Sequence, residues 1–171
     1  MHQIVLNEEF SLSYPDGFKE ISHETLEAMY HDSHGDLWGI EDKERHAKIL
    51  ITWHEANAFL GKLVSTRELC NRAEKVTRQK LKKYGYSCTD FFRTEAGGLE
   101  ADGFCYEYVK EGTDMAAEFL VLKHKSEKHR KSECYHILYY SRKEMDDGNR
   151  EVLKGILESV EIEPIQAVPL L

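Results

Sequence analysis

Four segments in the second half of the chain predict β-strands, and the later three are expected to be buried on both faces. They run at about Tyr86–Thr94, Gly103–Lys110, Met115–His124 and Cys134–Arg142. Neighbouring positions in the later three segments are apolar, as in Phe119-Leu120-Val121-Leu122, whereas a strand with one solvent-exposed face alternates between apolar and polar residues. The turn Glu111-Gly112-Thr113 joins the middle two strands into a hairpin. A sheet of this kind needs a layer of structure against each of its faces.

Two amphipathic helices are expected to supply those layers. Ser65-Thr-Arg-Glu68 fits a capping box, in which a hydroxyl and a carboxylate satisfy free backbone N–H groups. The apolar stripe that follows at helical spacing consists of Leu69, Cys70, Ala73, Val76, Thr77, Leu81 and Tyr84. Gly85 is expected to end this helix. A second helix carries Val152, Leu153, Ile156, Leu157 and Val160 on one stripe, with Asp146 or Asp147 as its cap and Pro164 as its stop.

The first half of the chain predicts shorter elements. Phe10–Tyr14 alternates strictly and predicts a strand with one buried face, followed by the turn Pro15-Asp16-Gly17. The other elements are a short helix capped by Ser22, a hairpin of Leu37–Glu41 with Lys48–His54, and a connection of one or two helical turns at Ala56–Val64. Together they predict a single α/β (α+β) domain over residues 1–171, a three-layer α/β/α sandwich around a mainly antiparallel sheet, with a short tail from about residue 164.

Two stretches resemble a known superfamily. Phe10-Ser-Leu-Ser-Tyr14-Pro15-Asp16-Gly17-Phe18 resembles the opening strand and turn of PsbP/Mog-like proteins. The aromatic strand Tyr135–Tyr140, followed by a helix ending in Ile156-Leu-Glu-Ser-Val160, is similar to their closing elements. The superfamily includes extrinsic photosystem II subunits, a Ran-binding transport factor, bacterial envelope proteins and chaperones of secreted effectors. The resemblance therefore implies the sandwich fold and the binding of other proteins without catalysis.

The residues that carry chemistry form no recognisable catalytic set. No Gly-x-Ser-x-Gly elbow, phosphate-binding loop or cysteine protease signature is present. The densest group of metal-ligand residues is His31-Asp-Ser-His34-Gly-Asp36, and His23 precedes it. His31, His34 and Asp36 are weak candidates for a metal site, because structural zinc sites show paired short spacings and no second pair occurs here. We therefore expect no cofactor, and a solvated loop at this segment.

The cysteines and the absence of a recognisable targeting signal indicate the cellular compartment that we expect for the protein. Cys70, Cys88, Cys105 and Cys134 are scattered, with no Cys-x-x-Cys pair. The first ten residues lack the basic region and the apolar region of a secretory signal. No apolar run is long enough to span a bilayer. We expect free thiols, three of them as small core residues, in a cytoplasmic protein without a membrane contact.

Positive charge is concentrated in two places although the net charge of the chain is −8. Residues 61–90 hold 8 basic and 3 acidic side chains. The segment from Lys123 to Lys131 joins two apolar strands, and its basic residues Lys123, Lys125, Lys128, Arg130 and Lys131 define a candidate partner surface. A solvated hairpin tip is the alternative, and nucleic acid ranks third, because the acidic total disfavours a polyanion. Whether the helix and the tip share a face is left open.

These observations lead to one preferred function and one alternative. We expect a non-catalytic protein-binding or adaptor module with a chaperone-like character, monomeric or weakly dimeric, whose partner is another protein. The alternative is a small-molecule or metal-binding protein, or a weak enzyme, centred on the segment His31–Trp38. A ligand retained through purification would favour the alternative.

Overall fold

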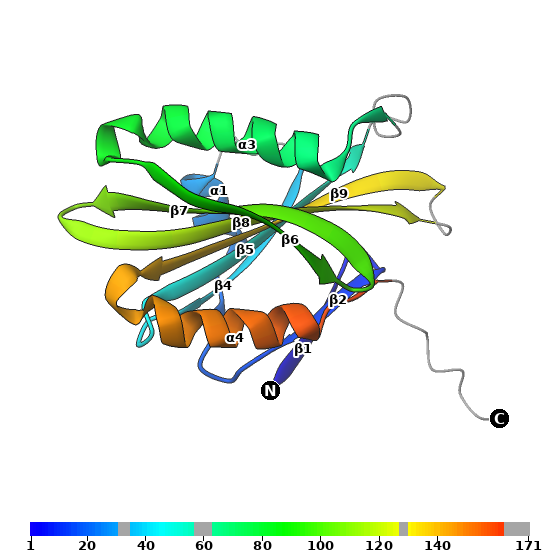
Figure 1. Ribbon diagram of the computed structural model, residues 1–171. Coiled ribbons are helices and arrows are strands. Elements are labelled where there is room, and N and C mark those ends of the chain that lie inside the picture. Colours follow the sequence, from blue (N-terminus) through cyan, green and yellow to red (C-terminus); the bar gives the residue numbers. More distant parts are fainter. Residues whose placement is uncertain (31–34, 57–62, 127–129, 163–171) are drawn as a thin grey trace.

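A seven-stranded antiparallel sheet forms the centre of the computed structural model, which describes residues 1–30, 35–56, 63–126 and 130–162 (Figure 1). Its strand order is β3-β4-β5-β9-β8-β7-β6. The bounds are β3 (Lys19–Glu20), β4 (Asp36–Asp42), β5 (Ala47–Ala56), β6 (Ser87–Ala96), β7 (Leu99–Lys110), β8 (Thr113–Ser126) and β9 (Lys131–Arg142). The four late strands and the early hairpin are therefore confirmed, and most of them extend a few residues further than predicted.

Helices cover both faces of this sheet, as the three-layer prediction requires. Helices α1 (His23–Met29) and α3 (Thr66–Leu81) lie on one face, and α4 (Asp146–Glu158) lies on the other (Figure 1). In β8 the side chains divide between the layers: Phe119 and Val121 pack on the α3 side, and Leu120 and Leu122 on the α4 side. Among the described residues, no helix is long and apolar enough to cross a membrane.

A second, three-stranded sheet shares the α4 layer and was not predicted. Strand β2 (Phe10–Tyr14) lies between β1 (His2–Leu6) and β10 (Glu161–Ile162). The expectation of one wet face for β2 is wrong, because Ser11 is as fully buried as Phe10. The prediction that Pro164 stops the last helix is also wrong, since α4 ends at Glu158 and the chain turns into β10 before residue 163. The last described strand thus pairs with β2, close to the start of the chain.

Two helices have the N-cap residue that the sequence predicts, and the third helix does not. Ser65 Oγ accepts from the Glu68 amide at 3.1 Å, and Ser22 Oγ accepts from the Thr25 amide at 3.3 Å. At α4 the expected cap by Asp146 or Asp147 is wrong. The 3-10 turn η2 (Lys143–Met145) leads directly into this helix, so both carboxylates fall in its first turn.

The predicted stripe of α3 packs on the sheet at Leu69, Cys70, Ala73 and Leu81, but it differs from the prediction at two positions near the helix centre. Glu74 is 3% exposed, whereas Val76, assigned to the stripe, is 50% exposed. A buried glutamate is tolerated here because the Tyr86 hydroxyl donates to Glu74 Oε1 at 2.9 Å and Arg78 donates to both carboxylate oxygens. The 3-10 turn η1 (Lys82–Tyr84) continues α3, and Gly85 ends it with a left-handed backbone, as predicted. Most of the predicted Ala56–Val64 connection lies outside the described residues.

Candidate functional site

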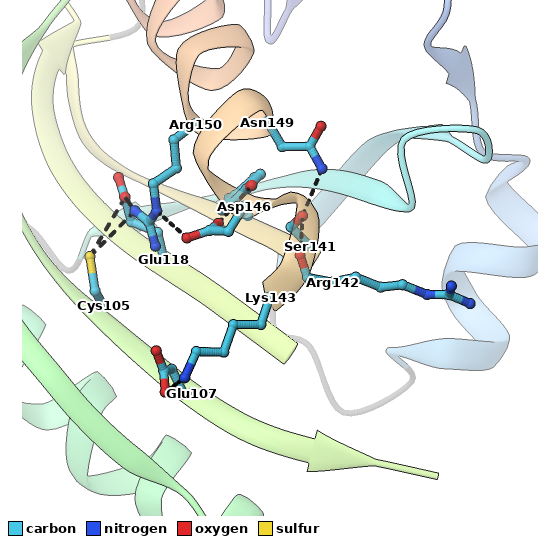
Figure 2. Close-up of polar contacts among 10 residues, drawn as sticks. Cys105, Glu107, Glu118, Ser141, Arg142, Lys143, Asp146, Asn149 and Arg150 are labelled. Carbon is cyan, nitrogen blue, oxygen red and sulfur yellow. Dashed lines mark hydrogen bonds and ion pairs between the residues drawn. The ribbon is translucent and has the colours of Figure 1, made fainter. Parts of the chain in front are cut away.

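A polar group on the α4 face surrounds Arg150 (Figure 2). Arg150 projects from α4 toward the sheet, where Cys105 of β7 and Glu118 of β8 are register partners. Its guanidinium lies 2.5 Å from Glu118 Oε2, 2.6 Å from Asp146 Oδ2 and 3.6 Å from the Cys105 sulfur. We call Cys105, Glu118, Asp146 and Arg150 the Arg150 cluster. It combines a thiol, two carboxylates and a cation, which are the groups that catalytic sites use.

The electrostatics of the Arg150 cluster favour a structural role. Burial, together with the charge of Glu118, raises the pKa of the Cys105 thiol to about 11 although Arg150 opposes the change. Burial also raises the pKa of Glu118 above its usual value, against the attraction of Arg150. Because the two carboxylates bind the guanidinium, its charge is neutralised within the protein. The cluster fixes α4 on the sheet and offers no ionised thiol near neutral pH.

All four thiols should therefore react slowly in the folded protein. Burial raises the pKa of Cys70 to about 11, and it also raises the pKa values of Cys88 and Cys134. At pH 7.5 a thiol with a pKa of about 11 has on the order of a hundredfold less thiolate than an ordinary cysteine. We expect labelling by a thiol-reactive disulfide dye to be at least that much slower at Cys70 and Cys105 in the native protein than in denaturant. Fast native labelling of Cys105 would contradict the structural role.

A shallow depression next to the Arg150 cluster is lined by Gly112, Thr113, Asp114, Arg142, Lys143 and Glu144. Its cations already have partners in the protein. Lys143 contacts Glu107 at 2.7 Å, as Figure 2 shows, and Arg142 lies 3.9 Å from Glu144. An anionic ligand would have to compete with these carboxylates, so the depression is a poor candidate for a ligand site.

The predicted basic partner surface lies where β8 ends and β9 begins. Lys125 and Arg130 are exposed, and Lys131 is half-exposed and 2.9 Å from Glu55. Lys123 is partly buried, and its Nζ donates to the Val64 carbonyl at 2.6 Å, which ties the start of α3 to β8. Lys128 lies outside the described residues. We call Lys125, Arg130 and Lys131 the basic tip.

A buried polar group supports the basic tip from the α4 side. Ser126 Oγ donates to Glu9 at 2.6 Å, and His124 Nε2 lies 3.4 Å from the same carboxylate. Glu133, which is opposite His124 in the sheet, accepts from the Tyr135 hydroxyl and from Asn7. Because these side chains are buried and joined to the β1–β2 turn, they anchor the last residues of β8 and the first residues of β9.

The histidine segment contributes little to a described site. His31 and His34 lie outside the described residues, and Asp36 is exposed at the start of β4. No three His, Cys, Asp or Glu side chains are arranged to hold a metal ion anywhere in the described ranges. Trp38 belongs to the core, and its indole N–H donates to Glu20 at 3.3 Å.

Comparison with solved structures places the chain in the PsbP/Mog1 fold, which confirms the resemblance seen in the sequence. Cyanobacterial PsbP from Synechocystis aligns over 94% of this chain and 91% of its own, with a TM-score of 0.68 and 10% identity. LpqN, involved in cell envelope biogenesis of Mycobacterium tuberculosis, aligns over 91% and 83%, with a TM-score of 0.62 and 14% identity. The Ran-binding protein Mog1p of Saccharomyces cerevisiae aligns over 94% of both chains, with a TM-score of 0.56 and 8% identity. No protein-family model and no curated protein sequence matches the chain.

Proposed function

We propose that this protein is a non-catalytic, cytoplasmic adaptor with a chaperone-like character that binds another protein through its basic tip. The main observation in support of this proposal is the position of the basic tip in the fold. The paired ends of β8 and β9 extend past the ends of α3 and α4, so a partner can reach them without displacing a helix (Figure 1). The buried contacts of Glu9, His124, Ser126 and Glu133 anchor the described ends of the two strands, which lowers the entropic cost of binding.

The charge of the tip defines the partner surface that fits it. Lys125 and Arg130 are exposed, and the exposed pair of Lys131 with Glu55 can open at little cost because surface ion pairs contribute little stability. An acidic patch on a folded protein is therefore the favoured contact. The raised pKa values of all four thiols support the non-catalytic part of the proposal.

A pull-down from the native cell with K125E/R130E as the variant tests this function. We expect the wild-type protein to retain a specific protein partner after chemical crosslinking, and the variant to lose most of it. Lys43 provides the matched control, since its side chain is 85% exposed and lies in the β4–β5 turn, so K43E should retain the partner. Thermal melts of all three proteins show that each is folded. Equal recovery by the two variants, or no specific partner at all, would overturn the proposal.

A further inference from the structure

The outer face of α3 and η1 carries a second concentration of positive charge. Its exposed charged side chains are Arg72, Lys75, Arg78, Lys80, Lys82 and Lys83, with Glu68 as the one acid. Arg72 pairs with Glu68 at 2.8 Å and Arg78 pairs with the buried Glu74. Lys75, Lys80 and Lys82 have no ion-pair partner within the described parts of the chain. This surface, which we call the α3 face, therefore keeps a positive charge after its internal pairs are counted.

Apolar side chains are exposed among these cations. Val76 is 50% exposed and Tyr84 is 39% exposed. Val76 lies one turn from Arg72 and one turn from Lys80, so it shares their stripe of the helix. Lys83 lies over the Tyr84 ring, with Nζ 4.9 Å from the ring centroid. Large apolar and aromatic groups surrounded by charge are the composition of a protein interface, where the apolar contact is desolvated and the charges form the rim.

The buried side of α3 holds this surface rigid. Asp102 is completely buried in β7 and binds Thr66 at 2.7 Å and Arg67 at 3.1 Å at the start of the helix. Glu74 binds the Tyr86 hydroxyl near the helix centre. Because Asp102 lies in β7 and Tyr86 directly precedes β6, these contacts anchor α3 to the sheet, and binding at the α3 face does not have to order the helix.

The charge on the rest of the molecule selects the kind of partner. The outer face of α4, on the opposite side of the sheet, exposes Asp147, Glu151 and Glu158 against Lys154, and the whole chain has a net charge of −8. A bilayer or a nucleic acid presents negative charge over a large area and is repelled by this excess. A short acidic segment touches the α3 face alone and does not meet the same repulsion.

We propose that the α3 face docks an acidic amphipathic helix of a partner protein, with carboxylates on Lys75, Lys80 and Lys82 and apolar side chains on Val76 and Tyr84. This site is separate from the basic tip and does not depend on it. The lysine-rich end of α3 and the tip lie at opposite ends of the sheet (Figure 1).

A titration of the isotope-labelled full chain with two synthetic peptides tests the proposal by NMR. The first peptide is a glutamate-rich helix with leucines on one face, and the second has serine at each leucine. We expect the first to shift amides of residues 72–84 and to bind at least about tenfold more tightly than the second, because only it supplies apolar contact. The charge-reversal variant K75E/K80E/K82E should weaken binding by roughly tenfold or more. The milder K75Q/K80Q/K82Q should weaken it less.

A matched control carries K43E/K110E/K154E, three exposed lysines outside the α3 face. Its affinity for the leucine-bearing peptide should stay within about twofold of the wild type. Equal weakening in the control, shifts confined to other surfaces, or tighter binding to heparin or to phosphatidylserine vesicles than to the peptide would overturn the proposal. Self-association through α3 and α4 at the protein concentration used would also overturn it, because it would make a second copy the occupant. Failure of the K125E/R130E pull-down would leave this titration unaffected, so the two proposals fail separately.

Discussion

Replacing Arg150 with methionine should lower the free energy of unfolding by about 3 kcal/mol or more. The side chain of Glu118 is 10% exposed, and it faces Arg150 at 2.5 Å. Methionine keeps the apolar stem of the arginine but leaves that carboxylate buried without its cation, which is a costly state. Asp146 also loses its contact at 2.6 Å, although the Tyr139 hydroxyl still donates to it. Urea unfolding at neutral pH, followed by circular dichroism, measures the loss.

Two further variants separate this effect from a general loss of charge. In R150M/E118Q the buried group is neutral, so most of the lost stability should return. R72M breaks the exposed pair of Arg72 with Glu68, whose side chains are 63% and 52% exposed, and its effect should stay within about 0.5 kcal/mol. An R150M loss no larger than that of R72M would show that the Arg150 cluster does not anchor α4.

The second large effect is expected at Asp102, beneath the start of α3. Burial disfavours its ionisation, yet hydrogen bonds from Thr66 and Arg93 and the charge of Arg67 hold its pKa below the usual value. The double variant R67M/R93M leaves a fully buried carboxylate with Thr66 as its remaining hydrogen-bond partner among the described residues. We expect it to lose about 3 kcal/mol of unfolding free energy at neutral pH. Denaturant unfolding of both proteins gives this difference.

The pH dependence of R67M/R93M should have the opposite sign from that of the wild type. In the wild type the lowered pKa of Asp102 contributes stability that is present above its ordinary value and is lost as the pH falls through the lower, folded value. Without the arginines, burial should raise that pKa, so protonation on acidification should stabilise the variant. Adding D102N to the variant should restore stability and remove this dependence. A variant that loses stability in parallel with the wild type as the pH falls would contradict the assignment.

The elements that the sequence predicted well are those whose local pattern and tertiary environment agree. Strands β7 to β9 are apolar at neighbouring positions, and they lie between two helical layers. Ser22 and Ser65 cap their helices because a hydroxyl at this position meets a free amide only one turn away. Such contacts are local, and a single stretch of residues specifies them.

The errors arose where a distant residue decides the outcome. Glu74 faces inward because Tyr86, twelve positions later, donates to it, and this turns Val76 outward. Ser11 is buried because β2 lies between β1 and β10, and no local pattern records the pairing of β2 with a strand at residues 161 and 162. The start of α4 is set by the preceding 3-10 turn, so Asp146 is free to bind Arg150.

The chemistry of the candidate sites was equally hard to predict. Cys105, Glu118 and Arg150 come from three elements, and no spacing in the sequence brings them together. The basic segments were visible as runs of charge, but their availability depends on partners such as Glu55 for Lys131 and the Val64 carbonyl for Lys123. Those partners are at least 59 positions away in the sequence.

Lysine acetylation footprinting of the crosslinked native complex tests the central claim, that the protein acts by binding another protein through its basic tip. Lys125 and Lys131 report on that tip, Lys75, Lys80 and Lys82 report on the α3 face, and Lys43, Lys110 and Lys154 are internal controls on other surfaces. We predict that Lys125 and Lys131 acetylate several-fold more slowly in the complex than in the free protein, with the three controls unchanged. Unchanged rates at Lys125 and Lys131, with protection of the control lysines, would contradict the claim.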